Sequence, residues 1–194
     1  MSTPTERPLR ADAVRNRRRA LDAATALLAE SSTPLSVEAI AKRAGMGTGT
    51  VVRAFGGKNA LIDAAVAELL RPIVERGKAL REEADSAAVL RGFLRELMAF
   101  QAAHYAVSDQ LDGLDLPATT RLRSDLVEVV ADMVRRARDQ GSIRDDIDPA
   151  AITTILGETA FAIAKASNDA AELADAFLAI FIDGLQPTSS RQRT

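Results

Sequence analysis

Apolar residues recur at spacings of three and four along nearly the whole chain, which is the period of an amphipathic helix. Val14, Leu21, Ala24 and Leu28 share one face in this way, whereas β-branched alternation around Asn-Gly or Asp-Gly turns is missing. The pattern predicts an all-α fold. The expected helices cover residues 12–30, 37–44, 48–55, 58–70, 86–105 and 117–140, a segment that begins at Pro149, and residues 170–185. A short helical turn is expected over residues 108–114, and Pro72 and Gly77 are possible kinks before residue 84.

Several helix ends carry their own signals. The Ser36 hydroxyl can accept an unpaired backbone amide of the helix that follows, and Gly45 permits the turn that ends it. Asp148 and Pro149 form a strong start signal, because the Asp side chain caps the helix and Pro at its first position loses only an amide that is unpaired anyway.

Composition indicates an ordinary globular protein. The 194 residues are 47% hydrophobic and 27% charged, and they include no cysteine, which excludes disulfides, thiolate metal sites and cysteine nucleophiles. No run of 18 apolar residues occurs, and residues 1–19 are polar and Arg-rich, so neither a membrane span nor a signal peptide is expected. We expect a soluble, cytoplasmic protein.

The net charge of −2 hides an asymmetry. Residues 1–58 hold ten basic and five acidic residues, a formal charge of +5, against −7 for the remainder. Such a basic segment favours contact with a polyanion, although a solvated basic tail would give the same count.

A helix-turn-helix is the strongest local pattern. Ile40, Ala44, Met46 and Val51 are spaced to pack two short helices together around Gly45. The second helix would then expose short or basic side chains at Thr48, Thr50 and Arg53, while Gly47 and Gly49 allow close backbone approach, as the major groove of DNA requires. The alternative is a purely structural helical hairpin.

Residues 17–66, which contain RRRALDAATALLAESS and LSVEAIAKRAGMGTGTVVRAFGGKNALIDAAV, resemble the N-terminal domain of the TetR family of bacterial transcriptional regulators. The resemblance implies that the two short helices bind DNA and that Lys58, at the start of the next helix, contacts a phosphate. The candidate DNA contacts are Arg17, Ser36, Gly47, Thr48, Thr50, Arg53 and Lys58. The chain departs from the family pattern at Val52, where a phosphate-binding Tyr is usual, at Ala54, where His is usual, and at Gly47, where Ser is familiar.

The second half resembles the family more loosely, through DQGSIRDDIDPAAITTILGETAFAIA. The last two helices are too apolar for one subunit to cover, and the family arrangement implies a four-helix dimer interface. Its candidate residues are Ile152, Leu156, Ile163, Phe177, Ile180 and Phe181. A terminal helix buried within one subunit is the alternative.

Helical phase also predicts a ligand cavity. On residues 86–105 an apolar stripe continues into Gln101 and His104, polar groups that need partners, of which a ligand could be one. The candidate lining residues are Phe93, Leu97, Met98, Gln101, His104, Tyr105, Leu126, Met133 and Thr159. For Gln101 and His104, core packing is an equal alternative, and the single His could also be a pH-sensitive core group.

Catalysis is not expected. No Glu-x-x-His, Gly-x-Ser-x-Gly or P-loop pattern occurs, and Glu158 has no positioned partner for general acid chemistry. We expect no cofactor and no metal.

These inferences predict a flexible basic arm (1–11), a helix-turn-helix domain (12–58), a ligand-binding and dimerisation domain (59–186) and a disordered tail (187–194). The function expected from the resemblance is a homodimeric repressor, released from a palindromic operator by a small, largely apolar molecule. The alternative is an all-helical dimeric ligand-binding or adaptor protein with weak DNA binding.

Overall fold

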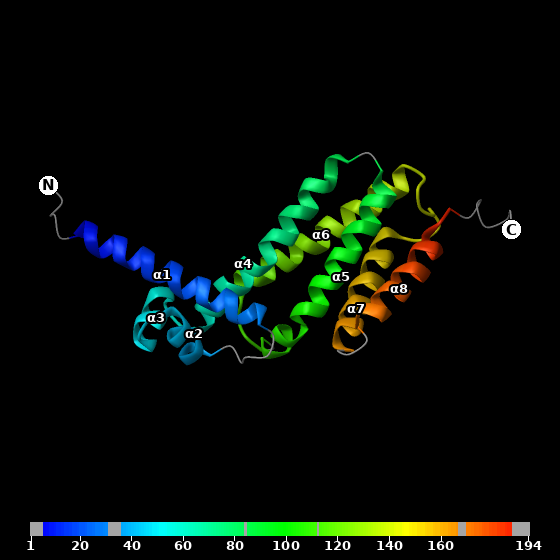
Figure 1. Cartoon of the computed structure of the whole chain (residues 1–194). Helices are drawn as coiled ribbons and strands as arrows, with labels where there is room; N and C mark the ends of the chain where they lie inside the picture. The colour runs from blue at the N-terminus through cyan, green and yellow to red at the C-terminus, as the bar shows by residue number, and fades with distance from the viewer. Residues whose placement is uncertain (1–5, 31–35, 84, 112, 167–169, 188–194) are drawn as a thin grey trace. The chain divides into compact units, whose positions relative to one another are not determined.

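The computed structural model describes residues 6–30, 36–83, 85–111, 113–166 and 170–187, and the part of the chain it describes holds helices and no strand (Figure 1). The all-α prediction is therefore confirmed. The elements are α1 (Glu6–Ala29), α2 (Val37–Ala44), α3 (Thr48–Phe55), α4 (Lys58–Ala79), a 3-10 turn (Leu80–Glu82), α5 (Ser86–Gln110), α6 (Pro117–Asp139), α7 (Pro149–Lys165) and α8 (Ala170–Leu185).

The chain divides into two compact units. The N-terminal unit contains residues 1–71 and 106–122, and the C-terminal unit contains residues 72–105 and 123–194. Helices α4, α5 and α6 each continue from one unit into the other. Since these units are defined by packing, the assignment of residues 12–58 to DNA binding and 59–186 to ligand binding stays a prediction.

Three helices expected from the sequence are longer than predicted. Helix α1 begins at Glu6 and so includes residues 6–11 of the expected arm; Pro8 lies in its first turn, where backbone amides have no helical partner. Helix α4 continues through Pro72 to Ala79. The residues after Pro72 are Ile73 and Val74, both buried, and their packing offsets the hydrogen bond that proline removes.

Helix α5 extends to Gln110 and takes in residues 108–110 of the separate turn expected over residues 108–114. The predicted tail beyond Pro187 and the first five residues of the arm lie outside the described residues.

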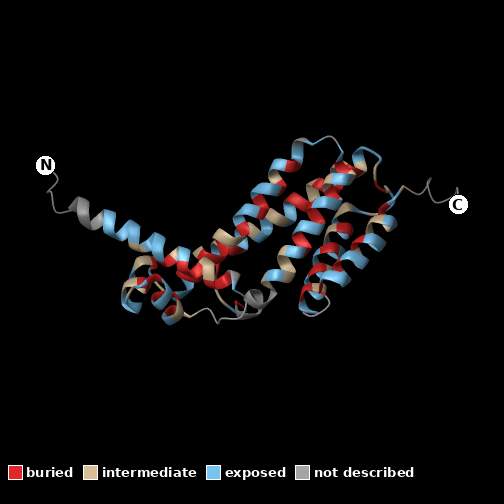
Figure 2. Cartoon of the chain, viewed as in Figure 1, coloured by how far each residue is buried: buried red, intermediate tan, exposed pale blue. Residues whose placement is uncertain are grey.

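The C-terminal unit has its own hydrophobic core. Phe93 and Leu90 of α5, Val134 of α6 and Ile152 of α7 are almost completely buried (Figure 2). Helix α4 approaches this core at Gly77, where an added Cβ would lie 2.5 Å from Val129 Cγ1 and 2.7 Å from Phe93 Cζ. Only a residue without a side chain fits there.

The segment before α7 is tied to the end of α8. The Arg144 backbone amide donates to the Leu185 carbonyl at 2.7 Å, and its guanidinium donates to the Gly184 carbonyl and to Asp146. Hydrogen bonding to Asp146 raises the pKa of Arg144 above its ordinary value. No described helix is both long and apolar enough to cross a membrane.

Candidate nucleic-acid interface and apolar cavity

Local signals in the sequence position the two short helices. Ser36 has an extended backbone, and its hydroxyl oxygen accepts the Ala39 amide at 3.1 Å, which caps α2. At the other end Gly45 adopts a left-handed conformation with φ of 60°, and the Met46 amide donates to the Ala41 carbonyl at 2.9 Å. Both predicted ends of α2 are confirmed, and the turn delivers the chain directly to α3.

Helix α3 buries one face and exposes the other. Val51 and Phe55 are buried against the rest of the N-terminal unit, whereas Gly47, Thr48 and Arg53 are exposed. Thr50 is half-buried, and Lys58 is exposed as the first residue of α4. Gly47 has no side chain that could cap α3, so the first backbone amides of α3 are available to bind an anionic group.

Two arginines of α1 brace the pair. Arg19 donates to the Ala44 carbonyl at the end of α2, at 2.6 Å, and Arg17 donates to the Ala54 carbonyl at the end of α3, at 2.7 Å. The Arg17 guanidinium also lies 4.1 Å from the centre of the Phe55 ring. Cations at helix C-termini are stabilising, so each arginine fixes one helix of the pair to α1.

Arg17 was predicted to contact DNA, whereas the contacts that the structure gives it are with the Ala54 carbonyl and the Phe55 ring of the same chain. The bracing role of Arg19 was not predicted, because its position in an Arg-rich run gave no signal of its partner.

Three of the predicted DNA contacts come together in one groove between α1 and α3. Arg17, Thr50 and Arg53 line it, and its volume is about 380 Å³. Ala13, Val14, Asn16 and Ala54 complete the lining. Ser36, Gly47, Thr48 and Lys58 lie outside this groove.

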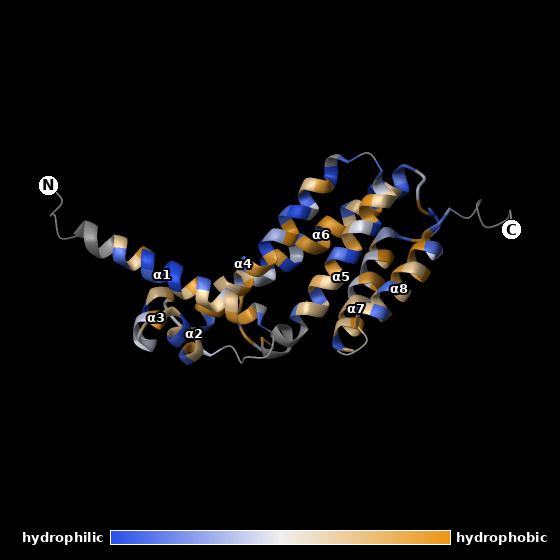
Figure 3. Ribbon diagram, in the orientation of Figure 1, coloured by the Kyte–Doolittle hydropathy of each residue, from blue (hydrophilic) through white to orange (hydrophobic). Residues whose placement is uncertain are grey.

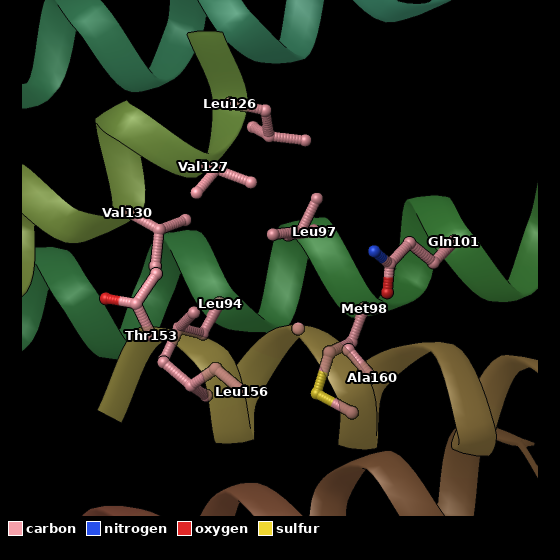
Figure 4. Close-up of a pocket in the computed structure, with 11 residues that line it drawn as sticks. Leu94, Leu97, Met98, Gln101, Leu126, Val127, Val130, Thr153, Leu156 and Ala160 are labelled. Atoms are coloured by element: carbon pink, nitrogen blue, oxygen red, sulfur yellow. The ribbon is translucent and has the colours of Figure 1, made fainter. Parts of the chain in front are cut away.

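A second hollow lies within the C-terminal unit, between α5, α6 and α7 (Figure 4). It is a cavity of about 80 Å³, lined by Leu94, Leu97, Met98, Gln101, Leu126, Val127, Val130, Thr153, Leu156, Gly157 and Ala160. Val127 and Gly157 are exposed, so the cavity reaches the surface beside them. Its walls are almost entirely apolar.

Gln101 is the exception in this lining. Its Oε1 atom is buried and has no hydrogen-bond partner among the described residues. Figure 4 shows its terminal amide directed toward the space bounded by Leu97, Met98 and Ala160. An unpaired buried acceptor of this kind is uncommon and marks a position where a partner is missing.

Four of the nine predicted ligand contacts line the cavity, namely Leu97, Met98, Gln101 and Leu126. Phe93 and Met133 are buried in the same core but do not line the cavity, and the Phe93 ring lies next to Gly77 of α4.

Neither His104 nor Thr159 lines the cavity. His104 is half-buried, with its Nδ1 2.8 Å from the Phe100 carbonyl oxygen one turn earlier. The side chain of Tyr105 lies outside the described residues. Thr153 and Val127 were missed, since their place at the cavity depends on how α6 and α7 pack. Among the described residues, no three His, Asp or Glu side chains are grouped as a metal site would require.

Comparison with known families decides the identity of the fold. Residues 85–187 match the family described as transcriptional regulator SbtR-like, C-terminal domain, and residues 20–65 match bacterial regulatory proteins, tetR family. The chain belongs to the TetR family of transcriptional regulators.

Solved structures agree with this membership. A TetR transcription regulatory protein from Mycobacterium vanbaalenii is 31% identical, with a TM-score of 0.63 over 92% of this chain and 99% of that one. A TetR regulator from Streptomyces coelicolor is 28% identical, with a TM-score of 0.64 over 89% and 99%. FadR from Bacillus subtilis, in complex with stearoyl-CoA, shares the fold at 18% identity, with a TM-score of 0.68 over 87% and 99%. Comparison with curated proteins gave no match.

Two of the three departures of this TetR regulator from the family pattern, Val52 and Ala54, lie in α3, and the third, Gly47, is the N-cap residue of that helix. Val52 and Ala54 are both half-buried, and neither has a side chain that can hydrogen-bond a phosphate. The exposed polar groups of α3 are therefore those of Thr48 and Arg53.

Helices α7 and α8 of this TetR regulator lie side by side, and both expose apolar side chains. Ile152 and Leu156, predicted for a dimer interface, are buried within the subunit, because they lie on the face of α7 that covers α5 and α6. Ile163, Phe177 and Phe181 are partly buried against the same core. Ile155, Phe161, Leu173 and Ile180 are the large apolar residues that α7 and α8 expose.

Figure 3 marks α8 as strongly hydrophobic, including stretches that Figure 2 marks as exposed. Ile180 is 75% exposed, so of the predicted interface residues it is the one that a partner would cover most.

Proposed function

We propose that this TetR-family regulator is a homodimeric repressor that binds a palindromic operator and is released from it by a small, largely apolar molecule. The observation that carries the proposal is that one chain combines an exposed recognition helix with an apolar cavity that contains an unpaired acceptor.

On the DNA side, α3 offers Thr48 and Arg53 at its surface, and Lys58 stands at the N-terminus of α4. Short hydroxyl side chains fit close to base edges, and basic groups neutralise phosphates. The charge of +5 on residues 1–58 supports the same assignment.

The apolar surface of α7 and α8 supports the dimer. Large exposed apolar patches are rare on soluble monomers and mark interfaces. In a two-fold dimer, two recognition helices about 34–36 Å apart read successive major grooves, so the operator should be palindromic.

The contacts of helix α6 support a route by which a bound ligand releases the operator DNA. Its first turn is held by Asp63 of α4, whose carboxylate accepts the Ala118 and Thr119 amides at 2.9 and 2.8 Å. Further along the same helix, Leu126, Val127 and Val130 line the cavity. A ligand that shifts α6 therefore acts on the helix that begins at Lys58.

The ligand of FadR from Bacillus subtilis is stearoyl-CoA, which supports a small-molecule effector for this fold. A cavity of about 80 Å³ is far too small for an acyl-CoA, so the effector proposed here is a smaller molecule.

Selection of bound duplexes from a random library, with the oligomeric state measured on the same preparation, tests the proposal. We expect a dimer and an enriched palindrome. A folded dimer that enriches no duplex would favour the ligand-binding or adaptor protein instead, with Val52 as the leading cause of weak DNA contact.

Lys58→Ala tests the phosphate contact. Each lost phosphate contact lowers the slope of log K against log salt by about 0.9, so the variant should bind every duplex more weakly and lose about that slope for each subunit. Arg91→Ala is the control, because it removes the same charge from an exposed site in the C-terminal unit. Equal slopes for Lys58→Ala and the unmodified protein would refute this contact.

A further inference from the structure

The chemistry of the cavity specifies its ligand more closely than its size does. Its described lining contains no Asp, Glu, Lys or Arg, so a charged ligand would find no counter-charge there. Moving a carboxylate or an ammonium into such a site is costly, and ionised ligands are therefore disfavoured.

The polar atoms of the lining select the type of hydrogen bond. The Thr153 hydroxyl already donates to the Pro149 carbonyl at 2.9 Å, so only its lone pairs remain available. Gln101 Oε1 is an acceptor without a partner. A ketone or ether, which only accepts hydrogen bonds, would leave Gln101 Oε1 unpaired, whereas a hydroxyl donates to it.

We infer that the cavity binds a neutral alcohol or phenol, whose hydroxyl donates to Gln101 Oε1 and whose hydrocarbon part contacts Leu97, Met98 and Leu126. This inference rests on the proposed ligand-binding role of the cavity and adds the chemical class of the ligand. Apolar cavities of about 150 Å³ hold benzene, so a single ring would fill this one and extend toward the opening beside Val127 and Gly157.

Phenol, benzene and benzoate form a matched set of probes with one ring each. Phenol carries a neutral hydrogen-bond donor, benzene has no polar group, and benzoate carries a negative charge. Binding is followed through the methyl resonances of ¹³C-labelled methionine. Met98 lines the cavity and Met46 belongs to the N-terminal unit, so a shift of Met98 with Met46 unchanged identifies binding in the cavity.

We expect phenol to bind the unmodified protein about tenfold more tightly than benzene, the effect of one hydrogen bond to a buried acceptor, and benzoate to bind most weakly. In Gln101→Leu the preference of phenol over benzene should disappear while benzene still binds. Gln101→Asn is the conservative variant, because it keeps a neutral amide oxygen as the acceptor, and it should keep the preference for phenol.

Thermal unfolding without ligand adds a measurement that does not depend on binding. Gln101→Leu should raise the melting temperature, because it removes a buried acceptor that has no partner. A lower melting temperature would show that Gln101 serves the fold and would overturn the inference. Equal binding of phenol and benzene, tightest binding of benzoate, or no Met98 shift with any probe would overturn it as well.

Failure of this inference and failure of the proposed function give different results. A phenol preference in a protein that enriches no duplex would refute the repressor and leave the ligand class standing. An enriched operator without a phenol preference would refute the ligand class and leave the repressor standing.

Discussion

Single residues decide how closely the helices of the C-terminal unit approach, and Gly77 tests this directly. In an exposed helix Gly→Ala is stabilising by about 1 kcal/mol. At Gly77 the new Cβ would lie within 3 Å of Val129 and Phe93, both almost fully buried, and such overpacking costs about 1–3 kcal/mol. We expect Gly77→Ala to lower the free energy of unfolding in a urea titration.

Gly92→Ala is the matched control for that change. Gly92 is exposed in α5, and an added Cβ there meets no atom within 4 Å. The control should raise the free energy of unfolding by up to about 1 kcal/mol. If both variants are stabilised equally, the close approach at Gly77 is not real.

The arginines of α1 make a second prediction at the scale of residues. Arg19→Ala removes a charged hydrogen bond to the end of α2 and should destabilise the N-terminal unit by about 1–2 kcal/mol. Arg18, its neighbour, pairs with Asp22 at the surface, so Arg18→Ala should cost less than about 0.5 kcal/mol. Hydrogen exchange of the α2 amides measures the difference, and similar exchange in both variants would contradict it.

At the scale of elements, the start of α6 depends on a residue of α4. Leu116, which precedes Pro117, has no side chain that can cap the helix. Asp63 takes this place from 55 residues away, with both carboxylate oxygens engaged and only 7% of the residue exposed. Asp63→Ala would leave two amides unpaired, that of Thr119 buried and that of Ala118 half-buried, and we expect a loss of about 2–4 kcal/mol in the free energy of unfolding.

Asp85→Ala provides the control for Asp63, since Asp85 also caps a helix but lies at the surface, where it accepts the Ala88 amide at 3.0 Å. Its loss should cost about 0.5–1 kcal/mol. Protection of the first amides of α6 against hydrogen exchange should fall only in Asp63→Ala. A comparable cost for the two variants would mean that Asp63 does not hold α6.

The contrast between local signals and contacts between distant segments explains how much could be predicted from the sequence. The bounds of α2 and α3 are local properties, written in Ser36, Gly45 and a short apolar repeat, and these predictions are confirmed. The continuation of α4 through Pro72 and the partner of Asp63 depend on packing between distant segments. A charged residue on the apolar face of α4 was the available signal that Asp63 needed a partner.

The candidate cavity divides in the same way. Helical phase placed Leu97, Met98 and Gln101 on a common face of α5, because residues three and four apart share a face. It could not tell which side of α7 covers that face. Leu156 was therefore predicted for a dimer interface although it lines the cavity, and Thr153, one turn earlier, was not predicted at all.

At the scale of the whole molecule, the proposed dimer predicts that one charge on α8 abolishes both assembly and tight operator binding. Ile180 is 75% exposed and lies on the apolar surface of α8. In Ile180→Glu the carboxylate would have to be desolvated at the interface without a counter-charge, so sedimentation velocity should show monomers at concentrations where the unmodified protein is dimeric. Arg123→Glu, which places the same side chain at an exposed position of α6, should remain dimeric.

Operator affinity then separates assembly from folding. A monomer presents one recognition helix to a palindrome, so Ile180→Glu should bind the full operator no more tightly than a half-site, while its helical circular dichroism matches that of Arg123→Glu. An Ile180→Glu protein that stays dimeric would move the interface away from α8. A monomer that still distinguishes the palindrome from its half-site would show that recognition in this regulator does not require two subunits.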